Sequence, residues 1–263
     1  MSLLLTSSIA LVTGASRGIG YATALALARN GAHVVATART VGGLEELDDA
    51  IKAAGGTTTL VPLDLRDHDG IARLAAALGE RYRKLDIFIG NAGIGGPSSP
   101  LDHVQPKEWD EIIAINVTAN WQLIRFLNPL LRNSGAGRVV FLTSGAPAKA
   151  RAYRGPYSAS KAALEALART YANETASTNV RVNLVSPGPT RTRLRALVMP
   201  GEDPMTLPTP NEIADKIVPL CLPSFSETGK LYDFETDKLL SFRAPGEEIS
   251  GTDQSPITPR ACS

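Results

Sequence analysis

The sequence is poor in cysteine and carries no excess of either charge. Its two cysteines, Cys221 and Cys262, lie far apart and outside any CxxC or Cys/His cluster, which argues against a disulfide framework or a zinc site and indicates a reducing, cytoplasmic compartment. The 27 Lys and Arg residues nearly balance the 26 Asp and Glu residues, so no overall field attracts nucleic acid or an anionic membrane. The three histidines show no metal-ligand spacing, and we expect no metal.

Long hydrophobic runs and targeting signals are also missing. A membrane helix needs about 18 or more apolar residues in a row, and the sequence holds no such stretch, so we expect no membrane span. Residues 1–12 contain short apolar runs without a basic leader or a small-residue cleavage site, and we expect no signal peptide. These absences predict a soluble protein whose partners are small molecules bound at local sites.

What the chain does contain is a regular alternation of short β-branched runs with longer Ala- and Leu-rich helical patterns, typical of βαβ units. A length of 263 residues, 43% of them hydrophobic, suits one large α/β domain. We predict a single-domain, Rossmann-type, doubly wound parallel sheet of about seven strands with helices on both faces. The expected strands are residues 8–13, 33–38, 57–63, 85–91, 138–144, 180–186 and 230–234, and the expected helices are residues 18–30, 44–54, 68–81, 106–131, 156–177 and 211–220.

Two segments break this alternation. Residues 187–210 contain six prolines and no clear period, and because loops after parallel strands cover ligands in α/β sheets, we interpret them as a substrate loop. Residues 241–263 are polar and rich in Gly, Pro, Ser and Thr, so we expect a poorly ordered extension after a domain of residues 1–240. The basic residues of the loops are either a site for an anionic substrate or solvated charge, and we favour solvated charge: Lys149, Arg151, Arg154, Arg191, Arg193 and Arg195.

A glycine-rich turn joins the first expected strand to the first expected helix. Such a turn is either a plain connection or a phosphate site, in which backbone N–H groups and the positive helix end hold a pyrophosphate. Its spacing, T-G-x-x-x-G-x-G over residues 13–20, differs from that of ordinary dinucleotide folds and resembles the nucleotide turn of the short-chain dehydrogenase/reductase family. The cofactor contacts expected from this turn are Gly14, Ser16, Arg17, Gly18, Ile19 and Gly20.

Three further segments match that family, although each alone is an ordinary turn or loop. The resemblance implies that residues 91–93 are the N-A-G element beside the cofactor and that residues 64–65 meet the adenine ring. It also implies that residues 187–192 contact the nicotinamide carboxamide. The residues carried over in this way are Asp64, Leu65, Asn91, Ala92, Gly93, Pro187, Gly188, Thr190 and Thr192.

The catalytic candidates are Tyr157 and Lys161, which a separation of four places on one face of a helix. With Ser144 at the end of a strand and Asn116 on an earlier helix, they resemble the Asn-Ser-Tyr-Lys set of the same family. Ionising a phenol of pKa near 10 at pH 7 costs about 4 kcal/mol, and a cation about 4 Å away supplies a similar energy. We therefore expect Lys161, helped by the oxidised nicotinamide, to lower the pKa of Tyr157, the acid/base.

The resemblance also implies the remaining roles of this set. Lys161 is expected to hold the nicotinamide ribose, Asn116 to support a water relay, and Ser144 to bind the developing oxyanion. Tyr157 and Lys161 thus count among the cofactor contacts as well as the catalytic residues. Family members commonly pair helices such as residues 156–177 between subunits, so a homotetramer or homodimer is expected.

The choice of cofactor depends on the end of the second expected strand. An acidic residue at this point accepts hydrogen bonds from the ribose of NAD, whereas this chain has Ala38 followed by Arg39. Arg39 and Arg17 offer two guanidinium groups to a 2′-phosphate, which predicts NADP(H). The expected activity is hydride transfer between NADP(H) and a carbonyl or alcohol. A dinucleotide-sensing regulator and an epimerase or dehydratase on the same fold are the alternatives, and the substrate is left open.

Overall fold

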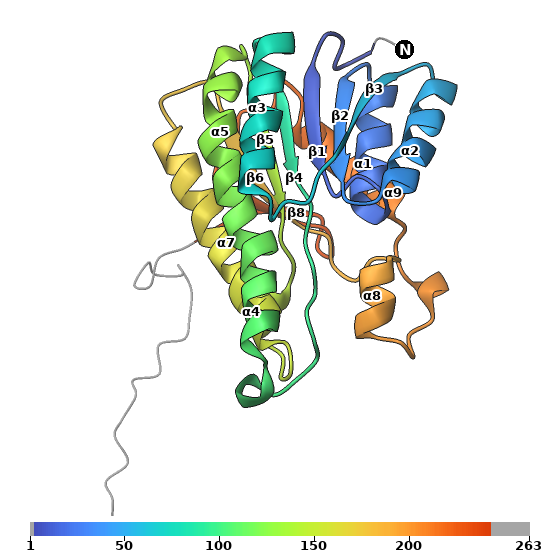
Figure 1. Cartoon of the computed structure of the whole chain (residues 1–263), viewed down its shortest axis with the longest axis vertical. Coiled ribbons are helices and arrows are strands. Elements are labelled where there is room, and N and C mark those ends of the chain that lie inside the picture. Colours follow the sequence, from blue (N-terminus) through green and yellow to red (C-terminus); the bar gives the residue numbers. More distant parts are fainter. Residues whose placement is uncertain (1–2, 243–263) are drawn as a thin grey trace, which may run out of the picture.

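The computed structural model describes residues 3–242, in which helices cover both faces of one central sheet (Figure 1). The strand order is β3-β2-β1-β4-β5-β6-β7-β8, parallel throughout except for the antiparallel β7–β8 pair. The strands are β1 (Ile9–Thr13), β2 (His33–Ala38), β3 (Thr57–Pro62), β4 (Ile87–Gly90), β5 (Arg138–Leu142), β6 (Arg181–Ser186), β7 (Lys230–Asp233) and β8 (Lys238–Ser241). The helices are α1 (Gly18–Arg29), α2 (Val41–Ala53), α3 (His68–Tyr82), α4 (Pro106–Ile113), α5 (Ala119–Asn133), α6 (Ala146–Lys149), α7 (Gly155–Glu174), α8 (Arg193–Val198) and α9 (Pro210–Leu220).

Two hydrophobic cores lie on opposite faces of the sheet. Successive side chains of a strand point to opposite faces, so Val12 packs into the core under α1, α2 and α9 while its neighbour Leu11 packs under α3, α5 and α7. Both faces of the central strands are covered, which is why β1, β4 and β5 are apolar runs instead of alternating patterns. The predicted doubly wound α/β fold is confirmed.

The eighth strand is the part of the sheet that sequence analysis missed. All four residues of β8 are exposed at the sheet edge, so they carry no burial pattern that a sequence can reveal. The strand ends at Ser241, one residue past the expected domain end at residue 240. The rest of the expected extension, residues 243–263, lies outside the described residues, and its low order stays a prediction.

The single helix expected over residues 106–131 is instead two helices. A π-helical turn, Ala114–Thr118, separates α4 from α5. Such turns are frequent at functional sites because an extra residue re-aims the side chains around it. Here the turn places Asn116 at the centre of the molecule, where the residue is completely buried.

The strand order reverses between β1 and β4, since β2 and β3 are added on one side of β1 and β4 to β8 on the other. Open α/β sheets bind ligands beyond the carboxyl ends of the strands at such a point. The substrate loop, residues 187–210, follows β6 at this edge and carries α8 and a 3-10 turn, Pro204–Thr206, although its sequence shows no period. In Figure 1 it stands off from the body of the molecule.

Within residues 3–242 no helix has the length and apolar character needed to cross a membrane.

Candidate active site

A first cleft of about 400 Å³ opens beyond the carboxyl ends of β1, β2 and β4, and the glycine turn forms its floor. Gly14 adopts a left-handed φ of +66°, and an added Cβ would lie 2.8 Å from the Asn91 amide nitrogen. A Cβ at Gly20 would overlap that amide and the Gly14 carbonyl. The turn therefore requires glycine at both positions, which leaves backbone N–H groups and the start of α1 open to an anion.

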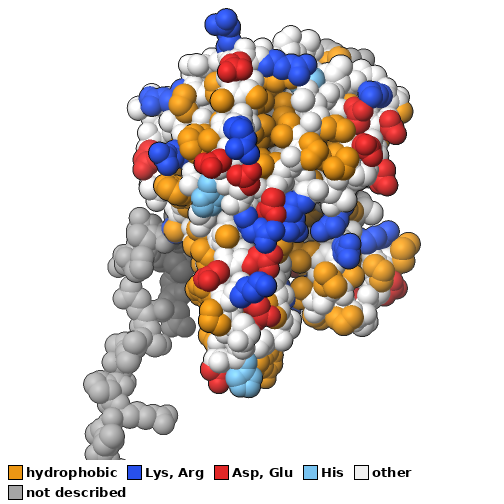
Figure 2. All heavy atoms as spheres, in the orientation of Figure 1, with side chains coloured by type: hydrophobic (Ala, Val, Ile, Leu, Met, Phe, Trp, Pro, Cys, Tyr) orange, Lys and Arg blue, Asp and Glu red, His pale blue; other side chains and the backbone are white. Residues whose placement is uncertain are grey.

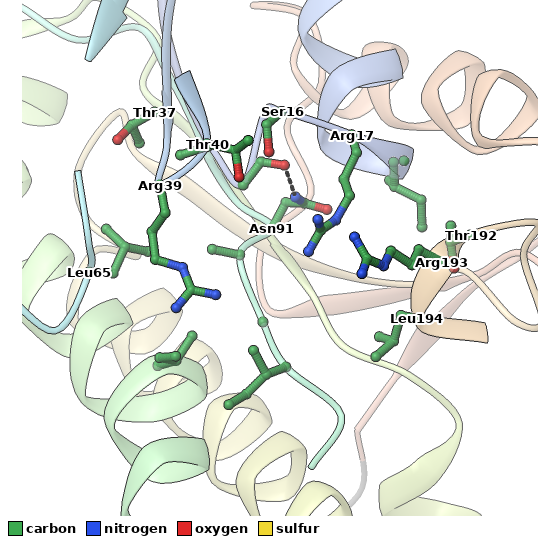
Figure 3. A pocket seen from close by; sticks show the side chains of 18 of the residues that line it. Ser16, Arg17, Thr37, Arg39, Thr40, Leu65, Asn91, Thr192, Arg193 and Leu194 are labelled. Atoms are coloured by element: carbon green, nitrogen blue, oxygen red, sulfur yellow. Dashed lines mark hydrogen bonds between the residues drawn. The ribbon is translucent and has the colours of Figure 1, made fainter. Parts of the chain in front are cut away.

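Asn91 fastens the glycine turn to the end of β4. Its side-chain amide donates to the carbonyl of Thr13 at 2.8 Å and to that of Gly14 at 3.2 Å. Figure 3 shows a dashed hydrogen bond from this amide. The backbone N–H groups of Asn91 and Ala92 donate to the Thr13 hydroxyl at 3.0 and 3.1 Å. These bonds join segments almost 80 residues apart in sequence, so the floor of the cleft is preorganised.

Four arginines line the first cleft: one is Arg191 of the substrate loop, and the other three come from different elements. Arg17 precedes α1, Arg39 follows β2, and Arg193 begins α8. Figure 3 shows the guanidinium groups of Arg17 and Arg193 facing each other across the cleft, with Arg39 on the side of Leu65. No acidic side chain stands at the end of β2, where Ala38 is buried. The cleft is thus suited to a ligand with several phosphates.

The three alternating arginines of the substrate loop have different surroundings, and the interpretation as solvated charge is wrong for Arg191 and Arg195. Arg191 donates to the carbonyls of Pro204, Met205 and Leu207, which fixes the shape of the loop. Arg195 forms a partly buried ion pair with Glu202. Arg193 is exposed and lines the cleft. Figure 2 shows Lys and Arg side chains gathered where the α8 segment adjoins the body of the molecule.

Asp64 lies in the wall of the first cleft but is already paired. Its carboxylate accepts bonds from the Arg66 guanidinium at 2.6 and 3.1 Å, and these bonds hold the pKa of Asp64 below its usual value. The pairing neutralises the one carboxylate of the cleft lining. An anionic ligand therefore meets mainly positive charge.

A second cleft, of about 450 Å³, holds the catalytic candidates Ser144 and Tyr157. Ser144 follows β5 and accepts the backbone N–H of Ala146 at 3.1 Å, while Tyr157 lies in the first turn of α7. Apolar side chains of the α8 segment cover the opposite wall: Leu194, Val198 and Met199. Ile19, Thr192 and Leu194 line both clefts, so the two spaces meet beside the start of α1.

Burial raises the pKa of Tyr157 above its ordinary value, and two neighbours oppose that rise. A hydrogen bond with Ser144 and the charge of Arg154 each lower the pKa. Sequence reasoning assigned the cation's effect to Lys161, whose ammonium lies 5.9 Å from the centre of the tyrosine ring. The guanidinium carbon of Arg154 is nearer to that centre, at 5.1 Å, so Arg154 is a second cation beside this phenol, and the effect of Lys161 stays a prediction.

Lys161 is buried behind Tyr157, with 4% of its surface exposed. Its ammonium donates to the Leu142 carbonyl at 2.7 Å, which aims it at the end of β5. Burial lowers the pKa of Lys161 to about 8, and the charge of Glu165 offsets only part of this shift. The lysine is therefore poised between its charged and neutral forms near physiological pH.

Asn116 holds three elements together. Its amide group donates to the Ile94 carbonyl and the Ser160 hydroxyl, both at 3.0 Å, and its oxygen accepts the N–H of Ile94 at 2.9 Å. Both side-chain donors are used, so the side chain fixes the π-helical turn against α7 and the loop after β4. The water relay expected from Asn116 stays a prediction.

The structure brings most of the expected residues to the two clefts. Fully buried Gly20 supports the floor from below, and Lys161 and Asn116 lie behind the wall. Sequence analysis missed Thr37, Thr40, Leu63 and Ile115 as lining residues of the first cleft, and none of them carries a local signal. Arg193 and Leu194 lie in the segment that it interpreted as the substrate loop. The first cleft is lined by Gly14, Ser16, Arg17, Gly18, Ile19, Arg39, Asp64, Leu65, Asn91, Ala92, Gly93 and Thr192, and the second by Ile19, Ser144, Tyr157, Pro187, Gly188, Thr190 and Thr192.

Known proteins share this architecture. Residues 8–203 match the family of short chain dehydrogenases. The uncharacterized oxidoreductase YciK of Escherichia coli strain K12 is 37% identical over 213 residues, which cover 80% of this chain and 84% of that protein. A short chain dehydrogenase from Shigella flexneri, solved in complex with NADP, has a TM-score of 0.85 at 36% identity and covers 89% of this chain and 99% of its own. Another from Escherichia coli, solved with NADPH, has a TM-score of 0.83 at 36% identity, with 89% and 98% covered.

The chain belongs to the short-chain dehydrogenase/reductase family, a family of oxidoreductases, as the resemblance of its motifs predicted.

Proposed function

We propose that this protein is an NADP(H)-dependent oxidoreductase that transfers a hydride between the nicotinamide and a carbonyl or alcohol. The observation that carries the proposal is the junction of the two clefts at Ile19, Thr192 and Leu194. The residues of this junction would hold the nicotinamide end of a dinucleotide bound in the first cleft, next to the cleft that contains Ser144 and Tyr157. The relatives solved with NADP and NADPH support the choice of cofactor.

The residues of the first cleft fit NADP(H). The glycine turn offers backbone N–H groups to the pyrophosphate, and Arg17, Arg39 and Arg193 supply positive charge for the 2′-phosphate. Buried Ala38 leaves no carboxylate to repel that phosphate. Thr192 lies at the junction and Thr190 lines the second cleft, and both are proposed to contact the nicotinamide carboxamide.

When bound, the reduced nicotinamide supplies the hydride that reaches the carbonyl carbon. Tyr157 donates its phenolic proton to the carbonyl oxygen, and Ser144 stabilises the negative charge that develops there. Lys161, fixed on the Leu142 carbonyl, is proposed to hold the nicotinamide ribose and favour ionised Tyr157 after proton transfer. In alcohol oxidation the same groups act in reverse, with Tyr157 as the base.

The direct test is the loss of NADPH absorbance when the protein is mixed with a panel of ketones, aldehydes and diketones. We expect turnover with at least one class. Tight NADPH binding without turnover of any member would instead indicate a dinucleotide-sensing regulator.

We predict that Arg39→Ala weakens the preference for NADPH over NADH by about tenfold or more, because a charged hydrogen bond contributes roughly 1.5 to 3 kcal/mol. Arg193→Ala should have an effect of the same sign. Adding Ala38→Asp to Arg39→Ala should move selectivity toward NADH through repulsion of the 2′-phosphate. The measurement is kcat/KM for both cofactors, with Arg29→Ala on the far end of α1 as the control. A wild-type protein whose kcat/KM for NADH equals or exceeds that for NADPH would contradict the assignment of NADP(H).

The substrate loop is expected to become more ordered when ligands bind. Its apolar side chains Leu197 and Met205 are largely exposed, whereas Leu194 and Met199 already line the second cleft. Hydrogen exchange over residues 190–210 should slow on addition of NADPH, and slow again with substrate. Equal protection with and without ligands would exclude a role as a lid.

A homotetramer or homodimer in the cytoplasm remains part of the proposal. Two large aromatic side chains on the outer surface of α4 and α5, Trp109 and Trp121, are 40% and 45% exposed, and aromatic residues are enriched at subunit interfaces. Light scattering coupled to size exclusion measures the assembly directly.

A further inference from the structure

Four basic side chains line the second cleft, and two of them are neutralised within the chain. Lys149 pairs with Glu235 at 3.1 Å, and Arg195 pairs with Glu202. Arg151 and Arg154 form no ion pair with any carboxylate of residues 3–242. Arg151 is exposed to solvent, whereas Arg154 is partly buried. Arg154 thus brings an uncompensated charge into the cleft.

The guanidinium of Arg154 is held in a defined position beside the reacting group. It stacks on the ring of Tyr157, with its central carbon 5.1 Å from the ring centre. One nitrogen lies 3.4 Å from the Ser98 hydroxyl, and a Cβ at Gly95 would come within 3.3 Å of another. The group has five N–H donors, and within the described chain its side chain makes only the bond to Ser98. The other donors are available to a ligand in the cleft.

This arrangement is unfavourable for the protein alone. Arg154 caps the positive end of α7, a helix of 20 residues with no acidic side chain in its first turn. A cation at a helix N-terminus is repelled by the helix dipole, and partial burial removes some of its hydration. A bound anion relieves both penalties at once.

We propose that Arg154 binds an anionic group of the substrate, so that the preferred substrates are carbonyl compounds carrying a carboxylate or a phosphate. Because the guanidinium lies against the same ring whose hydroxyl protonates the carbonyl oxygen, the anion and the carbonyl are only a few bonds apart. A planar guanidinium binds such anions through two parallel hydrogen bonds. The apolar side chains of Ala146, Val198 and Met199 line the same cleft and offer apolar surface to the carbon chain of such a substrate. The inference rests on the proposed function and adds the class of substrate.

The test compares matched substrates that differ only in charge. Short oxo acids are assayed with NADPH beside their methyl esters, and phosphorylated ketones beside their free alcohols, to distinguish the two anions. Wild type should favour the anionic member of at least one pair by about tenfold or more in kcat/KM, mainly through KM. Arg154→Met should abolish that preference and Arg154→Lys should restore part of it. Arg154 also changes the pKa of Tyr157. This change affects both members of a substrate pair equally, so it cancels in the ratio of their kcat/KM values.

Arg151→Met is the matched control, since it removes the same charge from the same loop at an exposed position. An equal loss of preference in Arg151→Met would overturn the proposal, because a general positive field would then account for it. If the wild-type protein has equal kcat/KM for the anionic and the uncharged member of every pair, the inference is overturned. The proposed oxidoreductase function would still stand.

A binding measurement distinguishes failure of the anion site at Arg154 from failure of the proposed oxidoreductase function. Saturated short carboxylates and alkyl phosphates, which cannot react, are titrated calorimetrically onto the protein loaded with NADP. Binding by wild type that falls about tenfold or more in Arg154→Met supports the anchor even if no carbonyl is reduced, in which case the proposed function fails alone. Equal binding by both proteins refutes the anchor.

Discussion

Replacing Tyr157 by phenylalanine is expected to lower kcat for carbonyl reduction by about a hundredfold or more, because a positioned general acid contributes at least this factor. NADPH affinity should stay nearly unchanged, since the phenol lies in the second cleft and the glycine turn and arginines lie in the first. Steady-state rates and fluorescence titration of NADPH separate the two effects.

Tyr153→Phe is the matched control, because Tyr153 also lines the second cleft yet is 60% exposed and four residues away from the proposed acid. It should keep nearly full activity. Retention of more than about a tenth of the wild-type rate by Tyr157→Phe would remove Tyr157 from the role of acid.

The pH dependence follows from the groups around the phenol. In the proposed mechanism Tyr157 donates its proton during reduction, so the rate should fall as pH rises through the pKa of this residue in the working complex. Burial raises that pKa and Ser144 and Arg154 lower it, so Arg154→Met should move the alkaline limb to higher pH.

Lys161→Met is expected to remove most activity and to change the dependence of stability on pH. Because burial lowers the pKa of Lys161 from 10.5 to about 8, the wild-type free energy of unfolding should rise between these two pH values, by up to about 3 kcal/mol. In that window the unfolded chain binds more protons than the folded one. The methionine variant should lack this part of the rise and lose affinity for NADPH.

Urea unfolding of wild type and Lys161→Met at about pH 7 and about pH 10 gives the change in the free energy of unfolding with pH for each protein. The titration of all other groups cancels when the two changes are subtracted. Lys149→Met serves as control, because Lys149 is an exposed lysine at the rim of the second cleft. Parallel stability curves for wild type and Lys161→Met would contradict a depressed pKa. An unchanged kcat in Lys161→Met would contradict its proposed part in the chemistry.

The sequence by itself determined the features that depend on local spacing. Seven strands follow from β-branched runs, since a parallel sheet buried on both faces needs apolar residues throughout. The glycine turn follows from residues 13–20, because a left-handed Gly14 and the close approach at Gly20 exclude a side chain. Tyr157 and Lys161 share a helix face because four residues make about one turn.

Only the tertiary structure decided features that depend on distant partners. Three arginines that look alike in the sequence have different surroundings in the structure. Arg195 forms an ion pair with Glu202, Arg193 lines the first cleft, and Arg154 lies over the ring of Tyr157. The break of the long helix at Asn116 depends on bonds to residues 22 and 44 positions away. A charge acquires its function from its neighbours in space, and no local pattern encodes which distant groups will surround it.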